Sequence, residues 1–340
     1  MPLFAFATLS PLILILLAGL WGGVWVLAAL LTLTLLTAAL DALIHRTLPP
    51  GSGAEFPAAD ALSVLIALGG IALLALSVHA LSGPALGPLE KAGLFAATGL
   101  YLGQVGNSNA HELIHRSNRW LHGLGMWAYI AVLFGHHTSA HVLVHHVRVA
   151  TRADPSSARR GEGLYRFMAR AWRGSFREGW AAESARLVRV GRPGWRHPYV
   201  LYLGGGMAMA LAAILIGGGA GLLWYLSLAG FAQAQLLMSD YVQHYGLTRA
   251  PGRGGKPEPV GPRHSWNSPH VASSALMLNA PRHSDHHAHP QRPYPALSLP
   301  AATDAPRLPR ALPVMACVAL VPPVWRRVMH PRLAAWQAKP

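Results

Sequence analysis

Nine histidines stand in four clusters, each at the end of a hydrophobic run, and they are the residues of this sequence best suited to chemistry. They fall in the segments HELIHR, AHVLVHHVR, DYVQHYGL and RHSDHHAHP, as His111, His115, His141, His145, His146, His244, His283, His286 and His287. Neutral imidazole is the commonest metal ligand, and one ion accepts only about four to six ligands. Nine histidines therefore predict two metal ions.

The spacing within the clusters suggests which histidines share an ion. Residues four apart lie on the same face of a helix. His111 and His115 are four apart, and so are His141 and His145. We therefore expect each of these pairs to close on one ion.

Carboxylates near the clusters are candidates for orienting the ligands, because a metal-bound imidazole usually donates its other nitrogen to a carboxylate or a carbonyl. The acidic candidates are Glu112, Asp240 and Asp285. For Glu112 the alternative is an ion pair with Arg116, four residues later. Asp154 is interpreted differently, as a residue that caps or turns the chain at Pro155.

The remaining histidines divide into two sets. His136, His264 and His270 lie close to the clusters and are predicted to act behind the ligands or in the wall of a pocket, with ordinary loop hydrogen bonding as the alternative. The isolated histidines are expected to be satisfied polar or interfacial residues; these are His45, His79, His122, His197 and His330.

The composition places these clusters in a membrane protein. Of the 340 residues, 52% are hydrophobic and only 12% are charged, which excludes an ordinary soluble domain. The apolar run 3–44 is too long for one span of about 20 residues and predicts two helices that turn near Trp21 to Gly23. Further apolar segments lie at 61–81, 89–110, 199–216 and 222–238. The sequence therefore predicts an all-α protein with six transmembrane helices.

The order of these segments puts all four histidine clusters on one side of the membrane. The clusters follow the fourth and sixth predicted spans, and the stretch 145–198 carries twelve arginines. An excess of Arg and Lys marks cytoplasmic loops, so the histidines are expected to face the cytoplasm. The formal charge of +15 is then mostly a consequence of topology. Anionic lipid or an acidic protein fits this face better than nucleic acid does.

The segments between the spans predict how the clusters are carried. The run 121–134 is too short to span and suits an interfacial or re-entrant helix, and 159–196 alternates Arg with aromatic residues, as surface helices do. The Gly- and Pro-rich stretch 250–262 predicts a loop, and 311–328 is expected to pack under the cytoplasmic domain. The expected organisation is a transmembrane part (1–110), a cytoplasmic histidine segment with interfacial helices (111–198), two more spans (199–243) and a C-terminal histidine segment (244–340).

Longer motifs connect these features to a known family. The chain resembles the integral-membrane di-iron alkane 1-monooxygenases of the AlkB type, within the membrane fatty-acid desaturase and hydroxylase superfamily. The motifs that carry the resemblance are NSNAHELIHR, GHHTSAHVLVHHVRVATRADPSSAR, DYVQHYGLTR, HSWNSPHVASS and RHSDHHAHPQRPYPAL, in that order. A desaturase would be expected to share the histidine boxes but not the QHYGL and HSWN segments.

The resemblance implies a function and a site. It implies a single desaturase-like domain in the bacterial inner membrane, and two iron ions held by the same nine histidines. It also implies activation of dioxygen, hydrogen abstraction from a terminal methyl group of an alkane, and hydroxyl rebound to a primary alcohol. Electrons would come from a rubredoxin and its reductase, since the one cysteine, Cys317, excludes a Cys-rich iron centre within the chain.

Three residues depart from the alkane-hydroxylase pattern: Ala140 and Gln243 each replace a Glu, and Asp240 replaces an Asn. Ala140 and Gln243 look more like the xylene-type methyl hydroxylases, so the sequence also fits an enzyme that acts on aromatic methyl groups. Gln243 is expected to act behind the ligand His244, and Asp240 to compensate for the lost carboxylates. The sequence also leaves room for a lipid desaturase or hydroxylase, and for a metal transporter with ligands along a path through the membrane.

Overall fold

The computed structural model describes residues 1–340 except 45, 48, 52–55 and 340, so His45 lies outside the described residues. The described part of the chain is helical and contains no named strand, only the isolated bridges Pro251 to Pro257 and Asn267 to Arg307. The first bridge closes the loop predicted over 250–262. The prediction of an all-α protein is confirmed.

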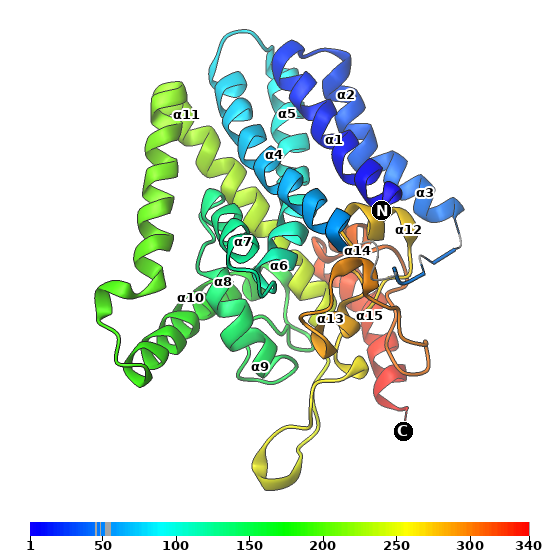
Figure 1. Ribbon diagram of the computed structural model, residues 1–340. Helices are drawn as coiled ribbons and strands as arrows, with labels where there is room; N and C mark the ends of the chain where they lie inside the picture. Colours follow the sequence, from blue (N-terminus) through cyan, green and yellow to red (C-terminus); the bar gives the residue numbers. More distant parts are fainter. Residues whose placement is uncertain (45, 48, 52–55, 340) are drawn as a thin grey trace.

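The apolar segments form long helices that lie side by side in the upper half of Figure 1. Four helical stretches within the described residues are long and apolar enough to cross a membrane: Pro2–Trp21, Val24–Leu43, Pro57–Ser82 and Pro198–His244. These correspond to α1 (Pro2–Trp21), α2 (Val24–Leu31) with α3 (Thr37–Leu43), α4 (Phe56–Ser82) and α11 (Pro198–His244). The predicted segment 89–110 is helical too, as α5 (Pro88–Tyr101), a π turn and the first half of α6 (Asn107–Ile114).

Helix α11 contains both of the last two predicted segments. It bends at Gly217 and Gly218, and Gly218 has a φ of 62°, a left-handed conformation that favours glycine. A side chain at Gly217 would collide with Ser82 of α4. Figure 1 shows the result, two arms of α11 that meet at the end of the molecule where α1 turns into α2 and α4 into α5. The histidine-bearing elements lie at the opposite end.

π-helical turns interrupt three of the helical stretches. They cover Thr32–Leu36 between α2 and α3, Leu102–Gly106 between α5 and α6, and His141–His145 between α8 (His137–Ala140) and α9 (His146–Arg148). A π turn bonds each N–H to the carbonyl five residues earlier, not four, and such turns are frequent at functional sites. They change which residues share a face, and hydrophobic periodicity does not reveal them.

The other elements surround the histidine clusters. The predicted helix 121–134 is α7 (Arg119–Ala131), which begins where Asn118 Oδ1 accepts hydrogen bonds from the Trp120 and Leu121 amides. The basic stretch forms one long helix, α10 (Leu164–Arg189), and the tail forms α14 (Leu312–Ala319) and α15 (Pro322–Gln337). The tail packs against α11 through α14.

A buried carboxylate joins the apolar helices to the histidine end. Asp41 at the end of α3 is 5% exposed, and its Oδ1 accepts hydrogen bonds from the amides of Ala272 and Ser273, 2.7 and 3.1 Å away. These amides belong to the first turn of α12 (Val271–Leu276), whose N–H groups have no partner within the helix. The single charge in the first apolar run is thus an anchor between two distant segments.

Candidate metal centre

The structure gathers all nine predicted histidines into two neighbouring groups. The first histidine group contains His111, His115, His141, His146 and His286. The second histidine group contains His145, His244, His283 and His287. In each group the facing ligand atoms lie within 4.8 Å of one another, so each group has the compactness that one metal ion requires.

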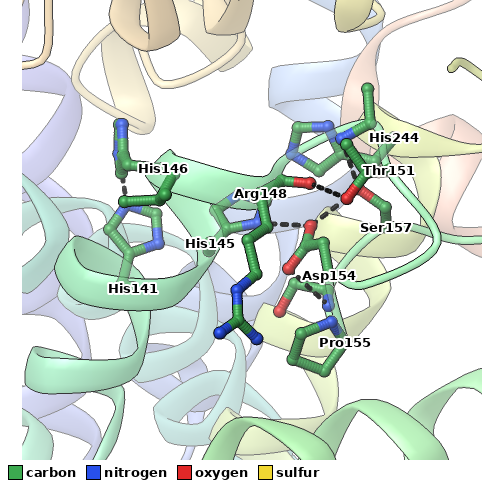
Figure 2. Close-up of polar contacts among 12 residues, drawn as sticks. His141, His145, His146, Arg148, Thr151, Asp154, Pro155, Ser157 and His244 are labelled. Atoms are coloured by element: carbon green, nitrogen blue, oxygen red, sulfur yellow. Dashed lines mark hydrogen bonds and ion pairs between the residues drawn. The ribbon is translucent and has the colours of Figure 1, made fainter. Parts of the chain in front are cut away.

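One predicted pairing is wrong. His111 and His115 do share a group, but His141 and His145 are divided between the two groups. The π turn over His141–His145 is the reason, because in such a turn residues five apart align. His141 therefore faces His146, with their Nε2 atoms 2.9 Å apart, and His145 turns toward the second group (Figure 2).

The distances between imidazoles test whether a metal ion fits. Two nitrogens bound to one ion at roughly 2.1 Å and at a right angle lie about 3 Å apart. The Nε2 atoms of His111 and His141 are 2.8 Å apart, and those of His244 and His283 are 2.9 Å apart. The Nε2 atoms of His115 and His145 are buried without a hydrogen-bond partner among the described residues. Buried polar atoms rarely lack partners, and a shared cation would satisfy them.

Burial keeps most of these imidazoles in the neutral form that binds metal. Burial, with further contributions from neighbouring histidines, lowers the pKa of His141, His286 and His287 well below the usual value. His145 differs: burial alone would lower its pKa, but the Asp154 carboxylate outweighs burial and raises it. Because neutral imidazole is a ligand for zinc, copper, iron and nickel alike, the donor set fits a transition metal without selecting one.

Asp154 is the carboxylate that contacts a histidine of the two groups. Its Oδ2 accepts a hydrogen bond from His145 Nδ1 at 2.8 Å and another from Ser157 Oγ at 2.7 Å (Figure 2). With Nδ1 protonated, the lone pair of His145 is on Nε2, which faces the second group. Asp154 also turns the chain, as predicted, because its Oδ1 accepts the Ser156 amide. The interpretation of Asp154 as a turn residue alone was incomplete.

Glu112 and Asp285 hold the backbone around the histidines. Glu112 Oε1 lies 3.1 Å from Arg116, the ion pair that the four-residue spacing suggested, and accepts the Tyr294 amide. Arg292 Nη1 lies 2.7 Å from each carboxylate oxygen of Asp285 and donates to them. Asp285 Oδ2 also accepts a hydrogen bond from the Ser298 amide. Both carboxylates fix the segment 292–298 against the helices that carry histidines.

Asp240 and Gln243 lie in the wall of a cavity next to the histidines. Gln243 accepts a hydrogen bond from Ser239 Oγ at 2.8 Å, and its Nε2 donates to the Ala280 carbonyl at 3.1 Å. Asp240 is buried, and its Oδ2 has no hydrogen-bond partner within the described residues. The side chain of Gln243 thus lies in the cavity wall and bonds Ser239 of its own helix and the Ala280 carbonyl, although the residue adjoins His244 in sequence.

The three further histidines predicted near the clusters make ordinary contacts. His136 packs against Phe134 and Trp172 and lies 3.3 Å from Ser175 Oγ. His264 contacts Glu258 at 3.1 Å, and His270 contacts Ser268 at 2.8 Å. None of the three belongs to either group.

Sequence reasoning missed His137, which is the neighbour of the first group. It begins α8, one helical turn before His141, and the two ring centroids are 5.0 Å apart. It also stacks on Phe134 and lines the cavity. The four-residue spacing from His137 to His141 was a usable signal, because this turn is a regular α-helix. Of the isolated histidines, His122 and His197 are hydrogen-bonded away from both groups, as expected.

The cavity joins the histidines to the apolar helices. It has a volume of about 440 Å³, and its wall includes His111 and His141 from the first group and His283 from the second. The rest of the wall is largely apolar and comes from the π turn before α3, from α5, α11 and α14, with residues such as Leu33, Leu100, Phe231 and Val314. A cavity of this kind accommodates an apolar molecule next to the imidazoles of both groups.

The chain is similar in sequence to known monooxygenases and to a wider enzyme family. Residues 91–319 match the fatty acid desaturase family. The chain is 36% identical to alkane 1-monooxygenase 1 of Pseudomonas aeruginosa over 259 residues, which cover 74% of this chain and 66% of that protein. It is 33% identical to alkane 1-monooxygenase 2 of Alcanivorax borkumensis over 78% of this chain and 70% of the relative. The hydroxylase component of a xylene/toluene monooxygenase of Pseudomonas putida is 27% identical over 74% of this chain and 67% of that protein. The chain spans about two thirds of the length of these relatives.

Proposed function

Because the chain belongs to the fatty acid desaturase family, we propose that it is a membrane-bound alkane 1-monooxygenase with a histidine-bound pair of iron ions. The resemblance to membrane alkane hydroxylases expected from the motifs is confirmed. The observation that carries the proposal is the cavity whose wall combines apolar side chains with imidazoles of both histidine groups.

The first histidine group would hold one iron ion and the second group the other. Bound there, the ions would supply the activation of dioxygen that hydroxylation of an unactivated methyl group needs. The protein's own residues perform the remaining tasks. Asp154 holds His145 with its Nε2 toward the second histidine group, and the burial of that group excludes water.

The overall reaction sets what must be delivered from outside. An alkane R–H, one O₂, two electrons and two protons give the alcohol R–OH and one water. The C–H bond supplies the other two electrons that O₂ takes up. The chain has one cysteine and no iron–sulfur site of its own, so the two external electrons would come from a rubredoxin and its reductase.

The substrate would enter from the lipid phase. A hydrocarbon partitions into the bilayer, and the cavity wall is built from the same helices that present apolar surface, α11 among them. The apolar lining binds an alkane by burial alone, without directional polar contacts along its length. The histidines at the cavity wall then face whichever carbon reaches them.

The arrangement of helices supports six membrane crossings with the histidines in the cytoplasm. Three chain reversals lie at one end of the molecule, after α1, after α4 and within α11, and the histidine groups lie at the other (Figure 1). The stretch 145–198, which begins at His145, carries twelve arginines, and such an excess marks a cytoplasmic segment. In this arrangement 1–110 and 199–243 are the membrane parts, and 111–198 and 244–340 form the cytoplasmic part.

A second candidate is hydroxylation of an aromatic methyl group. Gln243 lines the cavity, and it is one of the two residues that resemble xylene-type hydroxylases. Ala140, the other, packs on α10, where a Cβ added to Gly179 would lie 3.1 Å from that of Ala140. Because Ala140 is packed and Gln243 faces the cavity, Gln243 is the residue through which substrate preference would differ.

The test is product analysis in a host without other oxygenases. Cells expressing this chain with a rubredoxin and its reductase would be fed octane, hexadecane, xylene or a fatty acid separately. We expect primary alcohols from the alkanes, and loss of product in a His141→Ala variant. A double bond in the fatty acid, with no alcohol from either alkane, would identify a lipid desaturase and reject the proposal.

A further inference from the structure

One face of the histidine end combines unpaired positive charge with a chain of aromatic side chains that leads inward. We propose that segment 159–163 and α15 form the docking surface for an acidic one-electron iron–sulfur carrier, and that His330 and Tyr245 connect this surface to the second histidine group. The inference rests on the proposed function, since it concerns the delivery of its two electrons.

Tyr245 is the central residue of this connection. It follows His244 directly in the chain and is fully buried. Its hydroxyl lies 2.9 Å from His330 Nε2 and 2.9 Å from the Gly161 amide. The ring planes of Tyr245 and His330 are nearly parallel, with an interplanar angle of 17°. His330 of α15, which reaches the surface, is therefore linked by one hydrogen bond to Tyr245, and Tyr245 directly follows His244 of the second histidine group.

The surface around His330 carries positive charge. The pKa of His330 is lowered by burial and by the charges of Arg160 and Arg326, which places both guanidinium groups near this hydrogen bond. Arg327 on α15 is exposed as well. None of the three arginines has an ion pair within the described part of the chain, and residues 311–340 contain no acidic residue. Glu162, the acidic residue two positions after Arg160, is paired with Arg170.

The place of α15 favours a protein over the lipid surface as the partner. Figure 1 shows α15 running from α14 away from the apolar helices to the C-terminus. Anionic headgroups would attract a basic surface only within about one Debye length, roughly 8 Å at physiological salt. A negatively charged soluble carrier reaches the outer part of α15 without this restriction, and opposite charges accelerate such encounters.

The electron balance is simple. Each reduced carrier loses one electron and leaves as the oxidised form, so two carriers dock in turn for each alcohol formed. No bond in the protein is made or broken. Tyr245 and His330 keep their protons throughout and provide a packed path in place of solvent.

The first experiment measures docking directly, with rubredoxin as the probe and the full chain in nanodiscs of zwitterionic lipid. The double variant Arg160→Glu/Arg326→Glu should weaken rubredoxin binding by about tenfold or more, for metal-free and metal-loaded protein alike. The matched control Arg173→Glu/Arg177→Glu makes the same change of charge on exposed residues of α10 and should change the affinity less than about threefold. Equal losses in both variants, or none in the first, would overturn the docking surface. If the Arg160→Glu/Arg326→Glu variant instead lost binding to phosphatidylglycerol vesicles and kept its rubredoxin affinity, the surface would be a lipid-binding surface and the proposal would be overturned.

The second experiment separates docking from electron transfer. His330→Gln should leave the rubredoxin affinity unchanged but slow reduction of the metal centre by prereduced rubredoxin at least several-fold. Tyr245→Leu, which also removes the bond to the Gly161 amide, should slow reduction when rubredoxin is saturating. Tyr245→Phe, which keeps the ring, should slow reduction less than Tyr245→Leu does. Unchanged reduction rates in His330→Gln would overturn the path. Dithionite needs no docking surface, so single-turnover alcohol formation by dithionite-reduced double variant tests the proposed function separately.

Discussion

His145 donates its Nδ1 hydrogen to Asp154, 2.8 Å away, and through this bond the loop after α9 orients an imidazole of the second histidine group. Both residues are buried. The Asp154 carboxylate raises the pKa of His145, while His145, against the effect of burial, holds the pKa of Asp154 below its usual value. The pair makes the second group depend on a residue outside the four histidine motifs.

Asp154→Asn should therefore weaken metal binding in the second group selectively. Loss of the carboxylate lowers the donor strength of His145, and changes of this kind typically cost about 10- to 100-fold in metal affinity. Competition with an iron(II) chelator would measure the loss, with total iron determined by elemental analysis. Glu178→Gln is the control, because it removes a carboxylate that pairs with Arg148 on the surface. Equal chelator sensitivity of the two variants would show that Asp154 serves the turn only.

The nine histidines that meet could be predicted from sequence, but their division into two groups could not. The histidine clusters are evident in the sequence, and all nine residues come together in the structure. The pairing of His141 with His145 assumed a regular α-helix, whereas a π turn places His146 where the fourth residue was expected. The contact of Asp154 with His145 was not predicted either. An Asp before Pro is a strong local turn signal, which Oδ1 satisfies, but the bond of Oδ2 to His145 depends on the fold and not on local sequence.

The fold was predictable at the same level. The apolar runs became helices because their composition and length decide that outcome in an apolar solvent. The bend of α11 was visible too, because Gly217 and Gly218, whose dihedrals are not helical, fall between the predicted segments 199–216 and 222–238. The anchor of Asp41 on α12 joins residues more than 230 positions apart, and no periodicity reports such a contact.

Removing one histidine from each group should remove different iron ions. His286→Ala is expected to lose the ion of the first group, and His283→Ala the ion of the second, so each variant should retain about one iron per chain where the parent should hold about two. Both should lose hydroxylation, because the proposed reaction uses both ions. His122→Gln, altered away from both groups, should keep the parental iron content and activity. Parental iron in either alanine variant would contradict the assigned ligands.

Reporter fusions test the membrane topology. Fusions after Arg46, Arg160 and Gly252 should report the cytoplasm, and a fusion after Gly83 should report the periplasm. A reporter inserted after Gly218 should also be periplasmic, because the bend of α11 lies at the same end as the connection from α4 to α5 (Figure 1). A periplasmic signal at Arg160 would reverse the orientation and remove the proposed docking surface from contact with a cytoplasmic carrier.

Gln243→Glu should change substrate preference rather than metal content. The sequence places Gln243 beside His244, which predicts an effect on the metal, but its side chain lies in the cavity wall and donates to the Ala280 carbonyl. A glutamate cannot make that donation when ionised, and a carboxylate facing an apolar cavity is costly to desolvate. Binding of both octane and xylene should therefore weaken. The ratio of their kcat/KM values should shift by several-fold, because a flexible chain and a flat ring would contact the cavity wall at Gln243 differently.

The matched variant is Gln243→Met, which has a similar length and restores an apolar wall. It should recover octane turnover better than Gln243→Glu does, and both variants should retain the parental iron content. The measurement is a competition assay with octane and xylene in one reaction, with iron determined on the same preparation. An unchanged product ratio together with lost iron in Gln243→Glu would place the residue behind His244 after all. In that case the preference between aliphatic and aromatic methyl groups must be set elsewhere in the cavity, and Ala140, packed against α10, could not supply it.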